Sequence, residues 1–173
     1  MHDVIRNNDN ENKSNLYGKP ASASQIEMTE LVLPNDTNIL GNLLGGRLMH
    51  WIDIAGAMAA SRHSGRVVAT VALDSLDFRH PSRMGELVIL RAKLTWVGTT
   101  SMEVLVKAYA ENYKSGSVIL TNKAYVTYVA LDENGRPTPV PPLIVETEQE
   151  KKEFLEAEQR RRERLKRKQN ESF

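Results

Sequence analysis

The pattern of hydrophobic and polar positions predicts one long, strongly apolar helix near the first third of the chain. Between Leu48 and Ala60 the only ordinary polar side chains are His50 and Asp53. Apolar residues on nearly every face predict a helix that is buried nearly all round. A turn-rich loop, 35–41, and a pair of glycines at 45–46 precede it, and we expect the helix to end near Ser61.

The remaining apolar positions alternate with polar ones and predict strands. Residues 25–33 predict a first strand closed by a proline, and the continuous β-branched run 67–73 predicts a central strand. Segments 87–97 and 102–111 alternate cleanly around a short turn, and 118–131 predicts a long last strand. Without helical crossovers, the strands after the helix are expected to form an antiparallel meander. The order predicts an α+β fold, one antiparallel sheet wrapped around one helix, whose open edges favour self-association.

The end of the chain predicts a separate, charged helix. Thr147 and Glu150 have the spacing of a capping box, which opens a helix from about Glu148 to Lys168. We expect it to be mostly exposed, with i,i+4 ion pairs at Glu156/Arg160, Glu158/Arg162 and Glu163/Arg167. Its basic run, RRRERLKRK, lacks interleaved aromatic residues, so we do not expect a nucleic-acid partner. The predicted organisation is a flexible segment, 1–24, a domain, 25–145, and a C-terminal helix, 146–173.

Composition narrows the classes of function. The chain of 173 residues has no cysteine, which excludes a disulfide scaffold, a thiolate nucleophile and cysteine-ligated metal. No signal-peptide pattern or apolar run of membrane-spanning length is present, so we expect a cytoplasmic protein without a membrane partner. The histidines show no metal-ligand spacing, so no metal is expected, and the serine esterase motif Gly-x-Ser-x-Gly is absent.

Asp53 is the main candidate for chemistry. Small or flexible residues lie one or two helical turns away on the same side and leave room beside its carboxylate: Gly46, Met49, Ala57 and Ala60. An unpaired buried carboxylate is costly, so Asp53 is either a reactive acid or a structural one bonded to a backbone amide or an arginine. The glycine-rich approach to the helix offers free backbone N–H groups at Gly45 and Gly46, which suit an oxyanion or a phosphate.

The irregular connection DSLDFRHPSRMGE, 74–86, is the second candidate region. Its cationic side chains, Arg79, His80 and Arg83, fit either a solvated loop or a surface that binds phosphate.

These stretches carry a resemblance to a known family. The segment PNDTNILGNLLGGRLMHWIDIAGAMAA is similar to the signature of the hotdog-fold acyl-CoA thioesterases, the cytosolic, brain-type acyl-CoA hydrolases and their bacterial relatives. The similarity continues through RHSGRVVATVALDSLDF and KAYVTYVALDENGRPTPVP and covers about residues 25–154. It implies a hotdog fold, hydrolysis of fatty acyl-CoA to fatty acid and CoA, and no cofactor, since CoA is part of the substrate.

The resemblance also implies site residues and an assembly. Asn38 and Asp53 match the family's catalytic positions, which implies a homodimer in which Asn38 of one subunit faces Asp53 of the other, and relatives form trimers of dimers, so we expect a hexamer. The backbone N–H of Gly46, with Gly45, would polarise the thioester carbonyl. Asp53 would act as general base or as nucleophile, and Asn38 would orient the water or the carbonyl.

The remaining expectations concern binding and the alternatives. CoA-binding candidates are the cationic residues Arg79, His80 and Arg83 and the turn Gly98, Thr99, Thr100 and Ser101, with the acyl chain near Met49, Ile52 and Gly56. A non-catalytic acyl-CoA sensor of the same fold is the alternative function. A hydroxyacyl-CoA dehydratase is a further one, which would use a histidine, with His50 and His63 near the helix.

Overall fold

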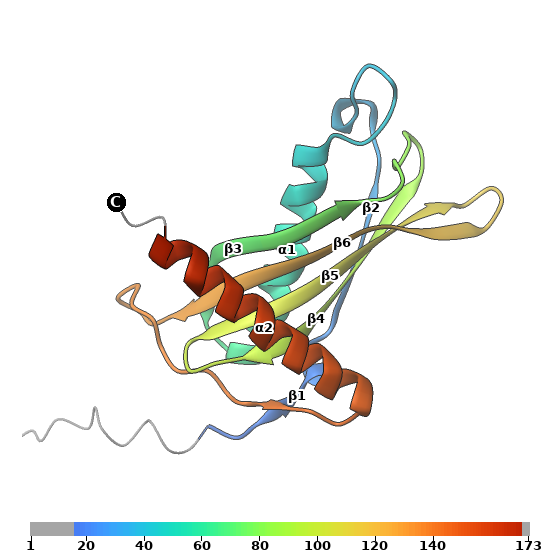
Figure 1. Ribbon diagram of the computed structural model, residues 1–173. Coiled ribbons are helices and arrows are strands. Elements are labelled where there is room, and N and C mark those ends of the chain that lie inside the picture. The colour runs from blue at the N-terminus through green and yellow to red at the C-terminus, as the bar shows by residue number, and fades with distance from the viewer. Residues whose placement is uncertain (1–15, 171–173) are drawn as a thin grey trace, which may run out of the picture.

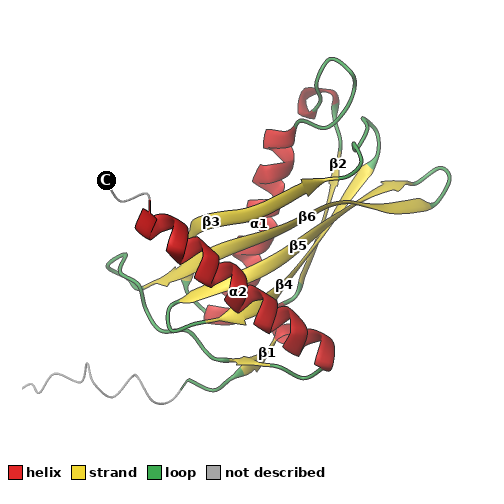
Figure 2. Cartoon of the chain, viewed as in Figure 1, coloured by secondary structure: helices red, strands yellow, loops and turns green. Residues whose placement is uncertain are grey.

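The computed structural model describes residues 16–170, which fold into an antiparallel sheet with a helix on each face. Five strands form the sheet: β2 (Ile26–Leu31), β3 (Val67–Phe78), β4 (Leu87–Val97), β5 (Ser101–Asn112) and β6 (Ser117–Leu131). Helix α1 (Gly45–Ser64) lies behind the sheet in the view of Figure 1, and helix α2 (Glu148–Asn170) crosses its front. Figure 2 shows the same arrangement by secondary structure. The predicted α+β class and the sheet around a central helix are confirmed.

The strand order is β2-β4-β5-β6-β3, and every neighbouring pair is antiparallel. The predicted hairpins β4–β5 and β5–β6 are correct. The prediction that β3 is a central strand in a continuous meander is wrong, because β3 pairs only with β6 and lies at the edge. The connection 79–86 is too long for a tight hairpin and instead contacts the loop before α1, where the N–H of Leu43 donates to the carbonyl of Ser82 at 2.7 Å.

Helix α1 packs one face on the sheet and leaves the other exposed. Its core-facing residues pack against the alternating apolar residues of β4, β5 and β6. The opposite face carries Met49, Ile54 and Met58, each about 40% exposed. The expectation of a helix buried nearly all round is therefore wrong for the single chain. The helix continues to Ser64, one turn beyond its predicted end, and Gly65 closes it in the left-handed conformation at φ 67°.

Helix α2 covers the outer face of the sheet with one side, while most of its residues are exposed, as expected. Ala157 is 1% exposed, and the Phe154 ring lies 6.4 Å from the ring of Trp96. The predicted i,i+4 pairs are not the interactions that form in the described helix. Its arginines reach the sheet instead, where Arg160 binds Glu103 and Arg164 binds Asp74. The basic run is thus partly neutralised within the fold.

Two short segments join the ends of the domain. β1 (Lys19–Pro20) and β7 (Leu143–Ile144) form a parallel pair, and the 3-10 turn η2 (Ala21–Ser24) follows β1. Part of the segment predicted to be flexible, 1–24, therefore packs into the fold, whereas residues 1–15 lie outside the described residues. Among residues 16–170, no helix is long and apolar enough to cross a membrane, and no three His, Asp or Glu residues group as a metal site.

Candidate active site

The carboxylate of Asp53 is held by hydroxyl groups from two strands. Thr70 of β3 donates a hydrogen bond to Oδ1 at 2.7 Å. Tyr128 of β6 donates to the same oxygen at 3.2 Å and to the main-chain carbonyl of Asp53 at 2.9 Å. No residue between 16 and 170 bonds or pairs with Oδ2. One oxygen of the carboxylate is therefore fixed and the other is left for a ligand or water, and the side chain is only half-buried.

Tyr128 can serve only as a hydrogen donor to this carboxylate. Burial raises the pKa of the Tyr128 phenol far above its usual value, and the neighbouring Asp53 charge raises that pKa further. The neutral hydroxyl reaches Asp53 because residue 56 is glycine. A Cβ at Gly56 would lie 2.3 Å from the hydroxyl oxygen, closer than any real contact. Gly56 thus serves the approach of Tyr128 to α1.

The start of α1 presents unpaired backbone donors, as expected. The cap residue, Leu44, supplies no side-chain hydrogen bond, and the first helical bond runs from Leu48 N–H to its carbonyl. In the described chain no acceptor binds the N–H of Gly45 or Gly46. A Cβ at Gly46 would meet no atom within 4 Å, so the space beside that residue is open, whereas a Cβ at Gly45 would contact the Phe78 ring at 3.6 Å. An anionic oxygen would be favoured there by both the amides and the helix dipole.

A carboxylate in the loop before α1 holds this helix start in place. Asp36 accepts the N–H of Leu33 at 3.0 Å and pairs with Arg47 of the first helical turn at 3.0 Å. Its carbonyl accepts the N–H of Leu44 at 2.9 Å. The 3-10 turn η3 (Pro34–Asp36) sets this geometry. Asp36 is 7% exposed and has a structural role that the sequence did not suggest.

Asn38 lies in the same loop but does not contact Asp53 within one chain. Its side-chain oxygen accepts the N–H groups of Leu40 at 3.0 Å and Asn42 at 3.2 Å, which closes the loop on itself. The amide nitrogen of Asn38 makes no bond within residues 16–170 and is exposed. The loop tip that it supports carries the exposed Ile39 and Leu40. Within the described chain the side chain of Asn38 therefore serves the loop and does not reach Asp53.

The predicted CoA-binding residues lie at two ends of the sheet. Arg79, His80 and Arg83 are exposed near the loop of Asn38, and Arg79 pairs with Asp77 at 2.7 Å. The turn 98–101 lies at the other end of β4, so one chain does not bring these groups together. The turn also has a structural role, since a Cβ at Gly98 would meet the Trp96 ring at 2.5 Å.

Two further expectations change once the packing is known. Ile52 and Gly56 face the sheet and are buried, so the acyl chain cannot run along them. Met49 is exposed and stays available for contact with the acyl chain.

His63 is fully buried, its Nε2 lies 2.8 Å from the carbonyl of Pro141, and burial lowers its pKa. His63 joins α1 to the segment before β7 and does not contact Asp53. It is therefore not available as the histidine that a dehydratase would use.

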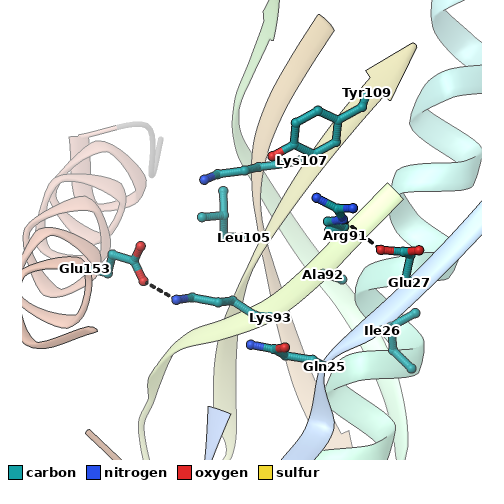
Figure 3. Close-up of a pocket in the computed structure, with 10 residues that line it drawn as sticks. All are labelled: Gln25, Ile26, Glu27, Arg91, Ala92, Lys93, Leu105, Lys107, Tyr109 and Glu153. Carbon is teal, nitrogen blue, oxygen red and sulfur yellow. Dashed lines mark hydrogen bonds and ion pairs between the residues drawn. The ribbon is translucent and has the colours of Figure 1, made fainter. Parts of the chain in front are cut away.

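A separate pocket of about 430 Å³ lies between α2 and the outer face of the sheet. Figure 3 shows Lys93 and Lys107 extending toward Glu153 and Arg91 extending toward Glu27. Most of these charges already pair, Lys93 with Glu153 at 2.9 Å and Arg91 with Glu27 at 2.7 Å. Asp53 is not among the residues that line this pocket.

Two residues that contact Asp53, Thr70 and Tyr128, were not predicted from the sequence. Thr70 is the one polar residue of the run VVATVAL, and Tyr128 follows a stretch of alternating apolar positions. A hydroxyl within an apolar strand was the available signal. That pattern did not indicate which residue of α1 each of the two hydroxyl groups would contact.

The chain is similar to known proteins in both sequence and fold. Residues 40–116 match the model of a family described as the thioesterase superfamily. A Bacillus subtilis protein named as an uncharacterized acyl-CoA thioester hydrolase is 43% identical over 84% of this chain and 84% of its own length. A crystal structure of a hexameric acyl-CoA thioesterase has 38% identity and a TM-score of 0.84, over 88% of this chain and 97% of that one.

The chain is also similar to the acyl-CoA hydrolase of Staphylococcus aureus. Its structure, in complex with butyryl coenzyme A, coenzyme A and coenzyme A disulfide, has 35% identity and a TM-score of 0.82, over 88% of this chain and 93% of that one. Structures also exist of that protein with an asparagine, an aspartate or a threonine each replaced by alanine.

Proposed function

The chain belongs to the thioesterase superfamily and is an acyl-CoA thioester hydrolase of hotdog fold, and on this premise we propose that Asp53 is its catalytic carboxylate. The observation that carries the proposal is the asymmetry of that carboxylate. Thr70 and Tyr128 hold Oδ1, while Oδ2 has no partner in the described chain. The alternative, a structural carboxylate bound by an arginine or a backbone amide, would need partners that the described residues do not supply.

In the proposed reaction Asp53 activates a water molecule. Oδ2 takes a proton from the water, and the water oxygen bonds to the thioester carbonyl carbon. The N–H of Gly46, with Gly45, stabilises the negative charge on the carbonyl oxygen. The carbon–sulfur bond then breaks, and the protonated Asp53 returns its proton to the CoA sulfur. The products are the fatty acid and CoA. Direct attack by Asp53 to form an anhydride remains the alternative route, and the same residues would support it.

The spacing of three residues supports these assignments. Asn38, Asp53 and Thr70 are separated by 15 and 17 positions. The asparagine, aspartate and threonine replaced in the Staphylococcus aureus hydrolase are separated by the same intervals. We therefore propose that Thr70 belongs to the catalytic group with Asp53, and that Asn38 orients the water or the carbonyl.

We propose that two copies of the chain complete each site. Asn38 has no contact with Asp53 inside one chain, and α1 exposes an apolar face of Met49, Ile54 and Met58. Burying that face against a second copy would remove apolar surface from water and bring the loop of Asn38 from one subunit to Asp53 of the other. Hexameric relatives fit a further assembly of such dimers. The separated CoA-binding candidates would likewise come from both subunits.

Release of free CoA from a panel of acyl-CoAs tests the function. Because the chain has no cysteine, a thiol-trapping dye reports only the product. We expect turnover by the wild type and a loss of about a hundredfold or more in kcat for Asp53→Asn. Glu133→Gln, which removes an exposed carboxylate in the turn after β6, is the matched control and should keep wild-type rates. Binding of acyl-CoA without thiol release by any of these proteins would replace the hydrolase with the acyl-CoA sensor.

Mixed dimers test the shared site. Asp53→Asn and Asn38→Ala chains, each inactive alone, should regain about a quarter of wild-type activity when co-refolded at equal amounts, because half of the dimers are mixed and each of those holds one intact site. If mixing restores no activity, both residues act within one chain and the shared-site proposal is wrong.

A further inference from the structure

Strand β3 carries two irregularities that flank the segment after Thr70. Thr70 pairs with Tyr128 on β6, but the next pair is Ala72 with Thr127, so Val71 has no partner. The ladder is interrupted again between Leu73 and Ser75. Asp74 is the unpaired residue there. In these bulges the strand is held less firmly by its neighbour than elsewhere.

The second bulge is held from the other side of the sheet by α2. The Asp74 side chain is 6% exposed and binds the guanidinium of Arg164, whose side chain is 12% exposed. Arg167 adds a second, looser contact at 3.8 Å. A buried carboxylate depends strongly on such a partner, because removing one member leaves an uncompensated charge. The unpaired residue of β3 is therefore tied to α2.

Helix α2 is itself fixed to the central strands. Arg160 forms a two-point ion pair with the buried Glu103 of β5, at 2.7 and 3.1 Å, and lies 3.6 Å above the ring of Tyr125 of β6. Thr95 of β4 donates to the same Glu103 at 2.7 Å. These contacts do not involve β3. Loss of the Arg164 contact would therefore remove the closer of the two ties between α2 and Asp74 and leave the helix in place.

We propose that Arg164 and Asp74 are positioning residues, through which α2 clamps the bulged segment of β3 and keeps the Thr70 hydroxyl on the carboxylate of Asp53. The inference rests on the proposed role of Asp53 and Thr70. Within the described chain β3 is an edge strand that pairs with β6, and Arg164 of α2 adds a contact to it from the outer face of the sheet. Four positions separate Thr70 from Asp74, which is short enough for a shift of one to move the other.

The first experiment compares kinetics of three arginine variants of α2. Arg164→Ala is expected to lower kcat about tenfold with KM within about twofold, because Thr70 orients the carboxylate and does not bind CoA. Arg164→Lys keeps a cation for Asp74 and should recover most of the loss. Arg162→Ala removes an exposed arginine of the same helix and should match the wild type. A loss in Arg162→Ala equal to that in Arg164→Ala would overturn the proposal.

A double variant separates positioning from a general effect on the fold. If the clamp acts through Thr70, Arg164→Ala should cost no further activity in a Thr70→Val background. If the two losses multiply, Arg164 acts by another route and the proposal fails. Should Arg164→Ala not fold, Asp74→Asn takes its place, since it removes the charge at nearly constant size, and the same two outcomes decide.

Hydrogen exchange gives a readout that needs no activity. Backbone amides of β3 are expected to exchange at least about tenfold faster in Arg164→Ala than in Arg162→Ala, while those of β5 stay unchanged. Equal exchange in β3 would refute the clamp whatever the catalytic role of Asp53. Conversely, full activity of Asp53→Asn would refute the proposed function even where β3 exchange rises as expected.

Discussion

The hydroxyl of Tyr128 donates to both the main-chain carbonyl and the carboxylate of Asp53, at 2.9 and 3.2 Å. One side chain thus fixes the backbone of α1 and the group that we assign to catalysis. Tyr128→Phe keeps the ring and removes both bonds. We expect kcat to fall about tenfold and the free energy of unfolding to fall by about 1–2 kcal/mol. Thiol release and urea denaturation measure the two effects, and Tyr113→Phe, at an exposed ring, is the control.

The close approach of Tyr128 to α1 predicts the effect of a single methyl group. In Gly56→Ala the new Cβ would lie 2.3 Å from the hydroxyl and 3.0 Å from the ring. Because both sides are packed, we expect a loss of about 1–3 kcal/mol in the free energy of unfolding and a marked fall in kcat. Gly46→Ala, at an open position of the same helix, should change stability little. Alanine favours a helix over glycine, so equal destabilisation by both substitutions would show that the close approach of Tyr128 does not set the cost.

The proposed oxyanion donor can be removed without removing a side chain. Gly46→Pro deletes the N–H in the first turn of α1, where proline is compatible with the helix. We expect kcat to fall about a hundredfold or more while the melting temperature changes little. Gly46→Ala retains the N–H and should stay active. If the proline variant folds and keeps its rate, another group stabilises the carbonyl oxygen.

Burial of His63 predicts a dependence of stability on pH. Its pKa is lowered in the folded protein, first by burial and further by Lys19, although the bond to the carbonyl of Pro141 opposes the shift. Below the unfolded value of about 6.5, the unfolded chain binds a proton that the folded chain excludes. Stability therefore rises with pH through this range and falls as the pH drops below about 6.5, by at most about 1.4 kcal/mol per unit for one group.

Urea denaturation between about pH 5 and 8 tests the assignment to His63. His63→Gln keeps a hydrogen-bond donor but does not titrate, so its stability should depend less on pH than that of the wild type. His50→Gln changes an exposed histidine of the same helix and should keep the wild-type slope. A slope that is unchanged in His63→Gln would assign the dependence to other groups.

The sequence predicted the bounds of an element well where apolar residues mark one side of it and polar residues the other. Strands β4 and β5 alternate apolar and polar residues, and both lie within about a residue of their predicted bounds. β3 has a continuous apolar run, which predicts a strand but not its position in the sheet. The open face of α1 was missed for the same reason, because apolar residues all round a helix do not say whether the sheet or a second copy covers each face.

The partners of charged residues were the least predictable part of the fold. Arg160 has Glu156 one helical turn away, yet it binds Glu103, which lies 57 positions earlier in the chain. Arg164 binds Asp74, which lies 90 positions earlier. Asp53 was found because it is an acid in an otherwise apolar helix. Thr70 and Tyr128 were not, since a hydroxyl in a strand identifies no partner until the sheet is folded around α1.

Because the ribosome adds α2 after the strands of the sheet, the contacts of α2 with the sheet have a further consequence. Glu103 is 3% exposed in the finished fold and depends on Arg160, which the ribosome adds 57 residues later. Until then the sheet would have to bury an unpaired carboxylate or leave its outer face open to water, and either state is less stable by several kcal/mol. Helix α2 thus completes the domain after the sheet has been translated, and a chain that stops before it is a natural target for quality-control proteases.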